Sequence, residues 1–296
     1  MTTKPTQATS LGVTHTPWQA LRQYTSARVA IGRSGTSIPT NELLKFQLDH
    51  AKAMDAVHAP LDIQALVTEL AANQAICVHT PMPPKVLETK APDRLAYLQR
   101  PDWGRELSDR AWQELTIPGK LPEQVYDLVI VIADGLSAVA VQSHAVEVLD
   151  YLIPRLVSDT EPPWRLAPIC IVSQGRVAVG DDIAQRLNAR AALVLIGERP
   201  GLSSPDSMGM YLTWGAARGT KDAQRNCISN VRPQGLSYST ACERAVYLLN
   251  EARRIENSGI VLKDRSDSEA VAVIEGEQPH KSFLVTSTDT GCQERR

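Results

Sequence analysis

Short apolar runs alternate with helical patterns in the second half of the chain. The runs Leu128–Ala133, Pro168–Val172 and Leu193–Ile196 are brief and are bounded by turn residues. Such runs are typical of strands buried on both faces, although for the last one periodicity alone also permits a short helix. Residues 138–157 and 181–188, between these runs, carry apolar residues at helical spacing. Strands that alternate with helices predict an α/β fold, Rossmann-like, with a mostly parallel sheet and flanking helices.

The first half of the chain has helical patterns but no comparable apolar runs. Thr40 is suited to cap a helix over residues 41–57. Its apolar face would consist of Leu43, Leu44, Leu48 and Ala51. The many prolines of residues 59–92 predict a connector with short structured pieces. A last helix is predicted over residues 239–257, ending before a glycine.

These patterns divide the chain into four parts. Residues 1–20 are polar and are expected to be a flexible N-terminus. Residues 21–120 form a mainly helical N-terminal region, and residues 121–263 form the α/β domain. Residues 264–296 are polar and charged without a sustained pattern, which predicts a disordered tail.

Composition narrows the class of protein. The net charge of −2 and the aromatic content of 5% favour neither an electrostatic nucleic-acid surface nor a base-stacking platform. The apolar runs are much shorter than the ~18 residues that indicate a membrane-spanning helix, and the N-terminus does not resemble a secretory signal. The five cysteines are odd in number and scattered, which favours reduced thiols in the cytosol.

Polar residues follow each of the three predicted strands. They are Asp134–Ser137, Gln174–Val177 and Glu198. Ligands of open α/β sheets bind in the crevice outside the carboxyl ends of the strands, so these loops are the candidate ligand site. Each has a plainer interpretation. Ser137 can be a simple helix cap, Gln174–Val177 an ordinary loop, and Glu198 a surface ion-pair partner of a nearby arginine.

Other reactive residue types carry weaker signals. Cys227 is of a type that most often packs as a small buried residue. Arg28 and Arg33 lie beside glycines and could meet a phosphate, or they could be solvated. The six histidines show no metal-ligand spacing. The common dinucleotide, P-loop, zinc-protease and hydrolase motifs are missing from the sequence, so these residues alone predict a crevice without naming its ligand.

Six segments together resemble the small subunit of ethanolamine ammonia-lyase. They are TSARVAIGRSGTSIPT, RPDWGREL, VIADGLS, SQGRV, GERPGLSSPDSM and RNCISNVRPQGLS, and they occur in the order of that family between Leu21 and Lys263. The pair GERPGL and CISN, about thirty residues apart, is the most specific part of the resemblance.

The resemblance implies a function and a set of site residues. It implies a subunit that binds adenosylcobalamin, a cobalt corrinoid, together with a large subunit in a hetero-oligomer of paired large and small subunits. The complex would convert ethanolamine to acetaldehyde and ammonia by radical chemistry, with no catalytic residue in this chain. By resemblance, the cofactor contacts are Val177, Glu198 and Cys227.

The resemblance leaves two questions open. The expected location is cytoplasmic, with the interior of a bacterial microcompartment as an alternative. A stand-alone flavodoxin-like binder of nucleotides or corrinoids, and an assembly protein with an empty crevice, are the competing functions. Ammonia release that needs both subunits and the cofactor would separate the first function from these two.

Overall fold

The computed structural model describes residues 12–14, 16–25, 27–115 and 126–266. The chain divides into two compact units, Met1–Lys263 and Asp264–Arg296. In the second unit only residues 264–266 are described, and there Ser266 N donates a hydrogen bond to the Asp264 carboxylate. Most of the predicted disordered tail lies outside the described residues. The predicted domain boundary between residues 120 and 121 lies wholly outside them.

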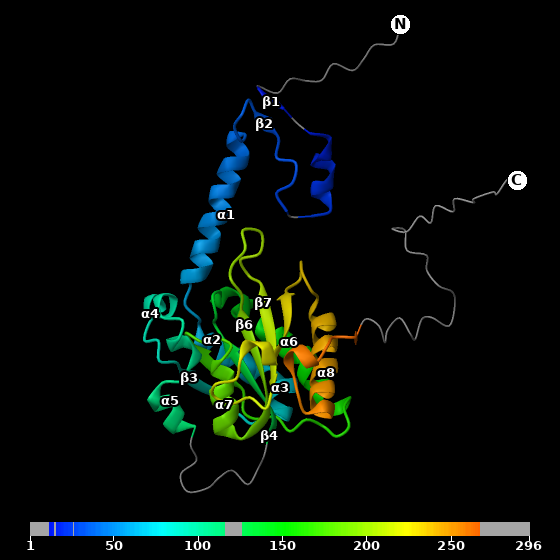
Figure 1. The fold of residues 1–296 in the computed structure, drawn as a ribbon. Coiled ribbons are helices and arrows are strands. Elements are labelled where there is room, and N and C mark those ends of the chain that lie inside the picture. The colour runs from blue at the N-terminus through cyan, green and yellow to red at the C-terminus, as the bar shows by residue number, and fades with distance from the viewer. Residues whose placement is uncertain (1–11, 15, 26, 116–125, 267–296) are drawn as a thin grey trace, which may run out of the picture. The chain divides into compact units, whose positions relative to one another are not determined.

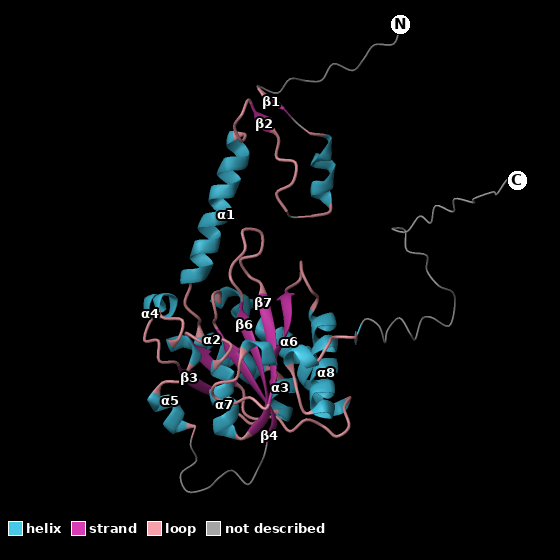
Figure 2. Cartoon of the chain, viewed as in Figure 1, coloured by secondary structure: helices cyan, strands magenta, loops and turns pink. Residues whose placement is uncertain are grey.

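A mixed six-stranded sheet forms the centre of the first unit (Figure 2). Its strands, in spatial order, are β3 (Lys85–Glu88), β5 (Cys170–Ser173), β4 (Tyr126–Ala133), β6 (Ala189–Gly197), β7 (Met208–Trp214) and β8 (Arg225–Val231). The first four strands are parallel, whereas β7 and β8 are antiparallel to their neighbours. The predicted α/β fold is confirmed, and the sheet is mixed. The Rossmann-like description stays a prediction.

Helices cover both faces of this sheet (Figure 1). One face packs against α2 (Ile63–Ala72), α3 (Gln74–His79), α6 (Ala138–Ser158) and α8 (Tyr238–Ile255). The other face packs against α5 (Asp109–Glu114) and α7 (Val179–Leu187). The remaining short helices are α4 (Arg94–Gln99) and the 3₁₀ helices η2 (Trp103–Arg105), η3 (Asp222–Gln224) and η4 (Gly259–Val261).

Strand β4 shows why the sheet is buried on both sides. Side chains alternate between the faces of a strand. Leu128, Ile130 and Ile132 join the core under α6 and α8, while Val129 and Val131 join the core under α7. All five are at most 1% exposed. A continuous apolar run is the expected sequence of such a strand, so this prediction is confirmed, as are β5, β6 and the helices after β4 and β5.

The short structured pieces predicted within residues 59–92 are α2, α3 and the edge strand β3. Two strands of the first unit differ from the sequence predictions. Strands β7 and β8 were not predicted. β8 is an edge strand whose buried hydrophobic residues are only Ile228 and Val231, so its sequence lacks an apolar alternation.

Residues 12–58 contain β1 (Val13–Thr14), the 3₁₀ helix η1 (Pro17–Gln23), β2 (Arg33–Ser34) and α1 (Thr40–His58). The helix predicted over residues 41–57 is confirmed, but Thr40 is its first residue, Pro39 stands at the cap position, and no side chain of the described residues caps it. Its apolar face is largely exposed, since Leu43, Leu44 and Leu48 are 42–58% exposed. Leucine periodicity therefore predicted the helix but not its burial. None of the helices in the described part of the chain is both long and apolar enough to cross a membrane.

Candidate functional site

A hollow of about 390 Å³ lies beside the N-terminus of α7. It is lined by residues of η2 and the loop before it, the β5–α7 loop, β7, η3 and β8: Pro101, Arg105, Arg176, Val177, Ala178, Tyr211, Asp222, Arg225 and Cys227. Two of the three predicted cofactor contacts, Val177 and Cys227, thus meet in one hollow. They lie 50 positions apart in the sequence and come from elements that only the fold brings together.

The loop that carries Val177 is held by the end of the neighbouring strand. Asp134, just after β4, accepts hydrogen bonds from Gln174 N (3.0 Å) and Gly175 N (2.9 Å). Burial raises the pKa of this carboxyl group, and these backbone bonds act in the opposite direction. A Cβ atom at position 175 would come within 2.9 Å of the Ala133 Cβ, and Gly175 avoids this close contact because it has no side chain. Asp134 and Gly175 therefore fix the loop that forms one wall of the hollow.

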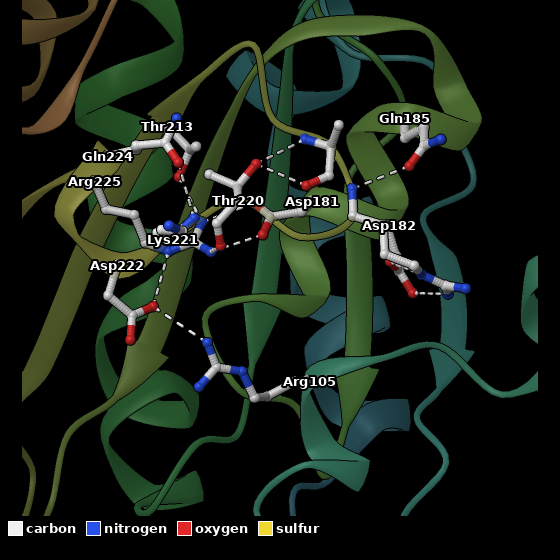
Figure 3. Close-up of polar contacts among 12 residues, drawn as sticks. Arg105, Asp181, Asp182, Gln185, Thr213, Thr220, Lys221, Asp222, Gln224 and Arg225 are labelled. Carbon is white, nitrogen blue, oxygen red and sulfur yellow. Dashed lines mark hydrogen bonds and ion pairs between the residues drawn. The ribbon is translucent and has the colours of Figure 1, made fainter.

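A buried ion pair joins this wall to strand β8 (Figure 3). The Arg225 guanidinium donates to both Asp181 oxygens at 2.7 Å, and the two side chains are only 3% and 2% exposed. Arg225 also donates to Thr213 Oγ1 (2.9 Å) and to the Thr220 carbonyl (3.0 Å). Asp181 lies in the first turn of α7, four positions after Val177, and Arg225 lies two positions before Cys227. The pair therefore sets the spacing of the two walls.

Glu198 lies directly after β6, as predicted, but outside the residues that line the hollow. Its Oε1 accepts a hydrogen bond from the Tyr211 hydroxyl at 2.9 Å, and Tyr211 does line the hollow. In the described part of the chain no arginine forms an ion pair with Glu198. Tyr211 thus connects the third predicted residue to the hollow.

Cys227 is exposed, which contradicts its interpretation as a small buried residue. In the register of β7 and β8 it lies opposite Tyr211. Its Sγ lies 3.1 Å from Ser229 Oγ. Partial burial of the thiol and the nearby Glu198 carboxylate raise its pKa, whereas hydrogen bonds with Ser229 and Tyr211 lower it less. Cys227 is therefore a neutral thiol at pH 7 that presents a small soft surface to the hollow.

Two arginines, Arg105 and Arg176, supply hydrogen-bond donors at the rim of the hollow. Arg176 stacks on the Tyr97 ring, with its guanidinium carbon 4.3 Å from the ring centroid. Arg105 contacts Asp222 at 3.4 Å, and both side chains are largely exposed. Arg225 also lines the hollow, but its nitrogens already donate to Asp181 and neighbouring acceptors. The rim therefore suits a ligand with carbonyl or phosphate oxygens.

Other candidates from the sequence lie elsewhere. Ser137 is the cap of α6, accepting from Ala140 N at 3.3 Å, so the plainer interpretation is confirmed. Ser137 also donates to the Pro205 carbonyl (2.8 Å) in the loop after Glu198. Arg28 pairs with Asp49, and neither residue lines the hollow. Among the described residues, no group of three or more histidine, cysteine or carboxylate side chains could hold a metal ion.

Sequence reasoning missed several residues of the site. Tyr211, Arg225 and Asp181 come from β7, β8 and α7, and only their pairing in space shows their role. A signal for Arg225 could have come from its position two residues before the candidate Cys227. Tyr211 lies within an apolar stretch and had none.

The fold and the hollow define an α/β protein with an open crevice beside the β5–α7 loop, a class that binds ligands at such loops. Residues 15–263 match the family model described as ethanolamine ammonia-lyase light chain. The ethanolamine ammonia-lyase small subunit of Pseudomonas fluorescens is 47% identical over 269 residues, covering 91% of this chain and 94% of the relative. The small subunit of Azotobacter vinelandii is 48% identical over 260 residues, covering 86% of this chain and 90% of that relative. The chain belongs to the ethanolamine ammonia-lyase light chain family.

Proposed function

We propose that this chain is the small subunit of an ethanolamine ammonia-lyase and binds adenosylcobalamin together with a large subunit. The complex would release ammonia and acetaldehyde from ethanolamine. The names of its relatives support the lyase and, through the word small, a larger partner. In this proposal the chain contributes binding and orientation of the cofactor and no catalytic acid or base.

The observation that carries the proposal is the convergence of the three residues expected from the family resemblance. Val177 and Cys227 line one hollow, and Glu198 reaches its lining through the hydroxyl of Tyr211. The sequence places these residues on three separate elements. Independent surface positions would have no reason to converge in this way.

The chemistry of the hollow fits the cofactor. Cobalamin carries a rim of amide groups and a nucleotide tail with a phosphate, so it offers both donors and acceptors. Arg105 and Arg176 supply donors at the rim, and Glu198 supplies an acceptor. When bound, adenosylcobalamin supplies the radical chemistry of the reaction.

The size of the hollow supports a shared site. At about 390 Å³ it is near the lower end of the roughly 300–1,000 Å³ typical of small-molecule pockets. A corrinoid with its nucleotide tail is too large to be enclosed there. This chain would therefore form one wall of the cofactor site, with Val177 and Cys227 against the ligand, and the partner would close the site and exclude water.

Co-expression tests the proposal directly. The chain is produced with and without the large subunit encoded beside it, and ammonia release is measured with and without adenosylcobalamin. We expect activity only when both chains and the cofactor are present. Cofactor binding by this chain alone at full affinity would favour a stand-alone corrinoid binder. If the large subunit is active without this chain, this chain would be an assembly protein. The cytoplasmic location stays a prediction.

Replacing Glu198 by glutamine is expected to weaken the apparent affinity for adenosylcobalamin about tenfold. Hydrogen bonds to a charged group contribute about 1.5–3 kcal/mol, and ~1.4 kcal/mol corresponds to a factor of ten. Glu198→Gln keeps the shape but removes the charge. The maximal rate should barely change, because in this proposal Glu198 takes no part in the chemistry.

The measurement is ammonia-lyase activity titrated with adenosylcobalamin. Glu114→Gln on α5 is the control, since Glu114 is exposed and lies outside the hollow. An unchanged half-saturation point in Glu198→Gln would remove Glu198 from the site. A loss of maximal rate at unchanged affinity would give this chain a part in the reaction itself.

A further inference from the structure

We infer that Tyr211 is a positioning residue that holds the Glu198 carboxylate at the edge of the hollow, with Gly209 leaving the space that the carboxylate occupies. This inference rests on the proposed cofactor site and extends it to two residues of β7. Neither residue belongs to the three contacts expected from the family resemblance.

The register of the sheet places the two residues on one face of β7. Gly209 and Tyr211 are two positions apart, so side chains at both positions point to the same side. Gly209 pairs with Ile196 and Tyr211 pairs with Val194 on β6. Glu198 follows β6 and can fold back over this face of its antiparallel neighbour. The contact therefore depends on the hairpin between β6 and β7.

Gly209 makes room for the carboxylate. A Cβ atom at position 209 would overlap Oε1 of Glu198 and would come within 3.0 Å of both Glu198 Cδ and Tyr211 Cε2. The Glu198 carboxylate thus lies where a side chain at position 209 would stand. The Glu198 backbone is held as well, since its N–H donates to the Ser207 carbonyl at 2.9 Å.

Tyr211 fixes the orientation of that carboxylate. Its hydroxyl donates to Oε1 at 2.9 Å and, among the described residues, is the one hydrogen-bond partner of the Glu198 side chain. One oxygen is therefore anchored, and a carboxylate keeps lone pairs for further donors. A glutamate with free rotamers would lose side-chain entropy on binding a ligand, whereas an anchored one has already lost it. The tyrosine would thus increase affinity by preorganising Glu198.

The test is direct binding of hydroxocobalamin to the purified complex of this chain with its large subunit. Equilibrium dialysis compares the original protein with Tyr211→Phe, Glu198→Gln and the double variant. Tyr211→Phe is expected to weaken binding roughly three- to tenfold, and the double variant should bind no more weakly than Glu198→Gln, because residues that act through one contact are not additive. Tyr151→Phe, in the second half of α6, is the matched control and should bind as the original does.

Gly209→Ala is the second variant, and it displaces the carboxylate while keeping the tyrosine hydroxyl. It should weaken hydroxocobalamin binding by a similar factor even if Tyr211→Phe does not assemble. Thermal unfolding of each complex separates loss of affinity from loss of folding.

Each outcome decides the inference. Unchanged affinity in Tyr211→Phe and Gly209→Ala overturns it, and so do additive effects of Tyr211→Phe and Glu198→Gln, which would mean that Tyr211 acts without Glu198. If Glu198→Gln weakens binding but Tyr211→Phe does not, the positioning role fails and the cofactor site stands. If the original complex retains no hydroxocobalamin, the cofactor site fails and the inference fails with it.

Discussion

Arg225→Met is expected to lower the free energy of unfolding by about 3 kcal/mol, at the low end of the ~3–5 kcal/mol that removing one partner of a buried ion pair costs. Methionine retains much of the apolar stem of arginine. It leaves the Asp181 carboxylate, which is 2% exposed, without its two hydrogen bonds of 2.7 Å. The loss comes mainly from an uncompensated buried charge.

Chemical denaturation of the original and variant chains measures this loss. The double variant Asp181→Asn, Arg225→Met should regain much of it, because no charge is then buried alone. Arg100→Met is the surface control. Arg100 pairs with Asp102 in an exposed ion pair, so its replacement should leave the unfolding transition almost unchanged. Equal effects of Arg225→Met and Arg100→Met would contradict a structural role for the buried pair.

The loss in Arg225→Met should also depend on pH. Burial raises the pKa of Asp181 in the folded chain, and the hydrogen bonds from Arg225 oppose that rise. Without Arg225 the folded pKa should rise further above the unfolded value of about 3.9. A raised carboxyl pKa means that stability present below the unfolded pKa is lost as the pH rises through the folded pKa. The difference in free energy of unfolding between the variant and the original should therefore be smallest near pH 4 and largest at neutral pH.

Gly197→Ala is expected to destabilise the chain by about 3 kcal/mol, the upper part of the usual range for overpacking. Its new methyl group would overlap the backbone carbonyl of Ser137 and come within 2.6 Å of the Asp134 carbonyl oxygen. Backbone atoms cannot turn away as a flexible side chain can. The Gly197 carbonyl also accepts a hydrogen bond from Leu136 N at 2.9 Å, and separating the two loops would break it.

Gly215→Ala is the comparison for Gly197→Ala. A Cβ at position 215 would meet no atom of the described residues within 4 Å, so the cost of Gly215→Ala is that of a positive φ of 62°, about 1 kcal/mol. Denaturant unfolding should give Gly197→Ala a clearly lower free energy of unfolding than Gly215→Ala. Because Glu198 follows Gly197, the first variant should also weaken cofactor binding. A stable Gly197→Ala chain with unchanged cofactor affinity would show that the loops can separate without cost to the site.

The strands that the sequence predicted are those whose burial is uniform. Residues of β4 and β6 are covered on both faces, so nearly every position must be apolar and the run is visible in one dimension. Strand β8 is an edge strand with one buried residue in its middle and one at its end, and its ladder partner decides its conformation. The Thr40–His58 helix shows a different case, because its leucine spacing predicted the helix and its apolar face but carried no information on whether that face is buried, and the described structure leaves it exposed.

The candidate site likewise has features that the sequence predicted and features that only the fold produces. The position of Glu198 after a strand was predictable, because a strand end is a local feature of the sequence. The contact of Glu198 with Tyr211 depends on the antiparallel register of β6 and β7. The pair of Asp181 and Arg225 joins residues 44 positions apart. Sequence spacing carries no information on such pairs.

The sequence by itself determined the α/β class, the three central strands and their post-strand loops, because local burial and turn chemistry decide each of these. Its motifs also indicated the family to which the chain belongs. Only the tertiary structure decided that the sheet is mixed, that Val177 and Cys227 face one hollow, and that a tyrosine joins Glu198 to it. The physical reason is that strand pairing and buried ion pairs are long-range contacts, and their energies depend on partners that no local stretch of sequence contains.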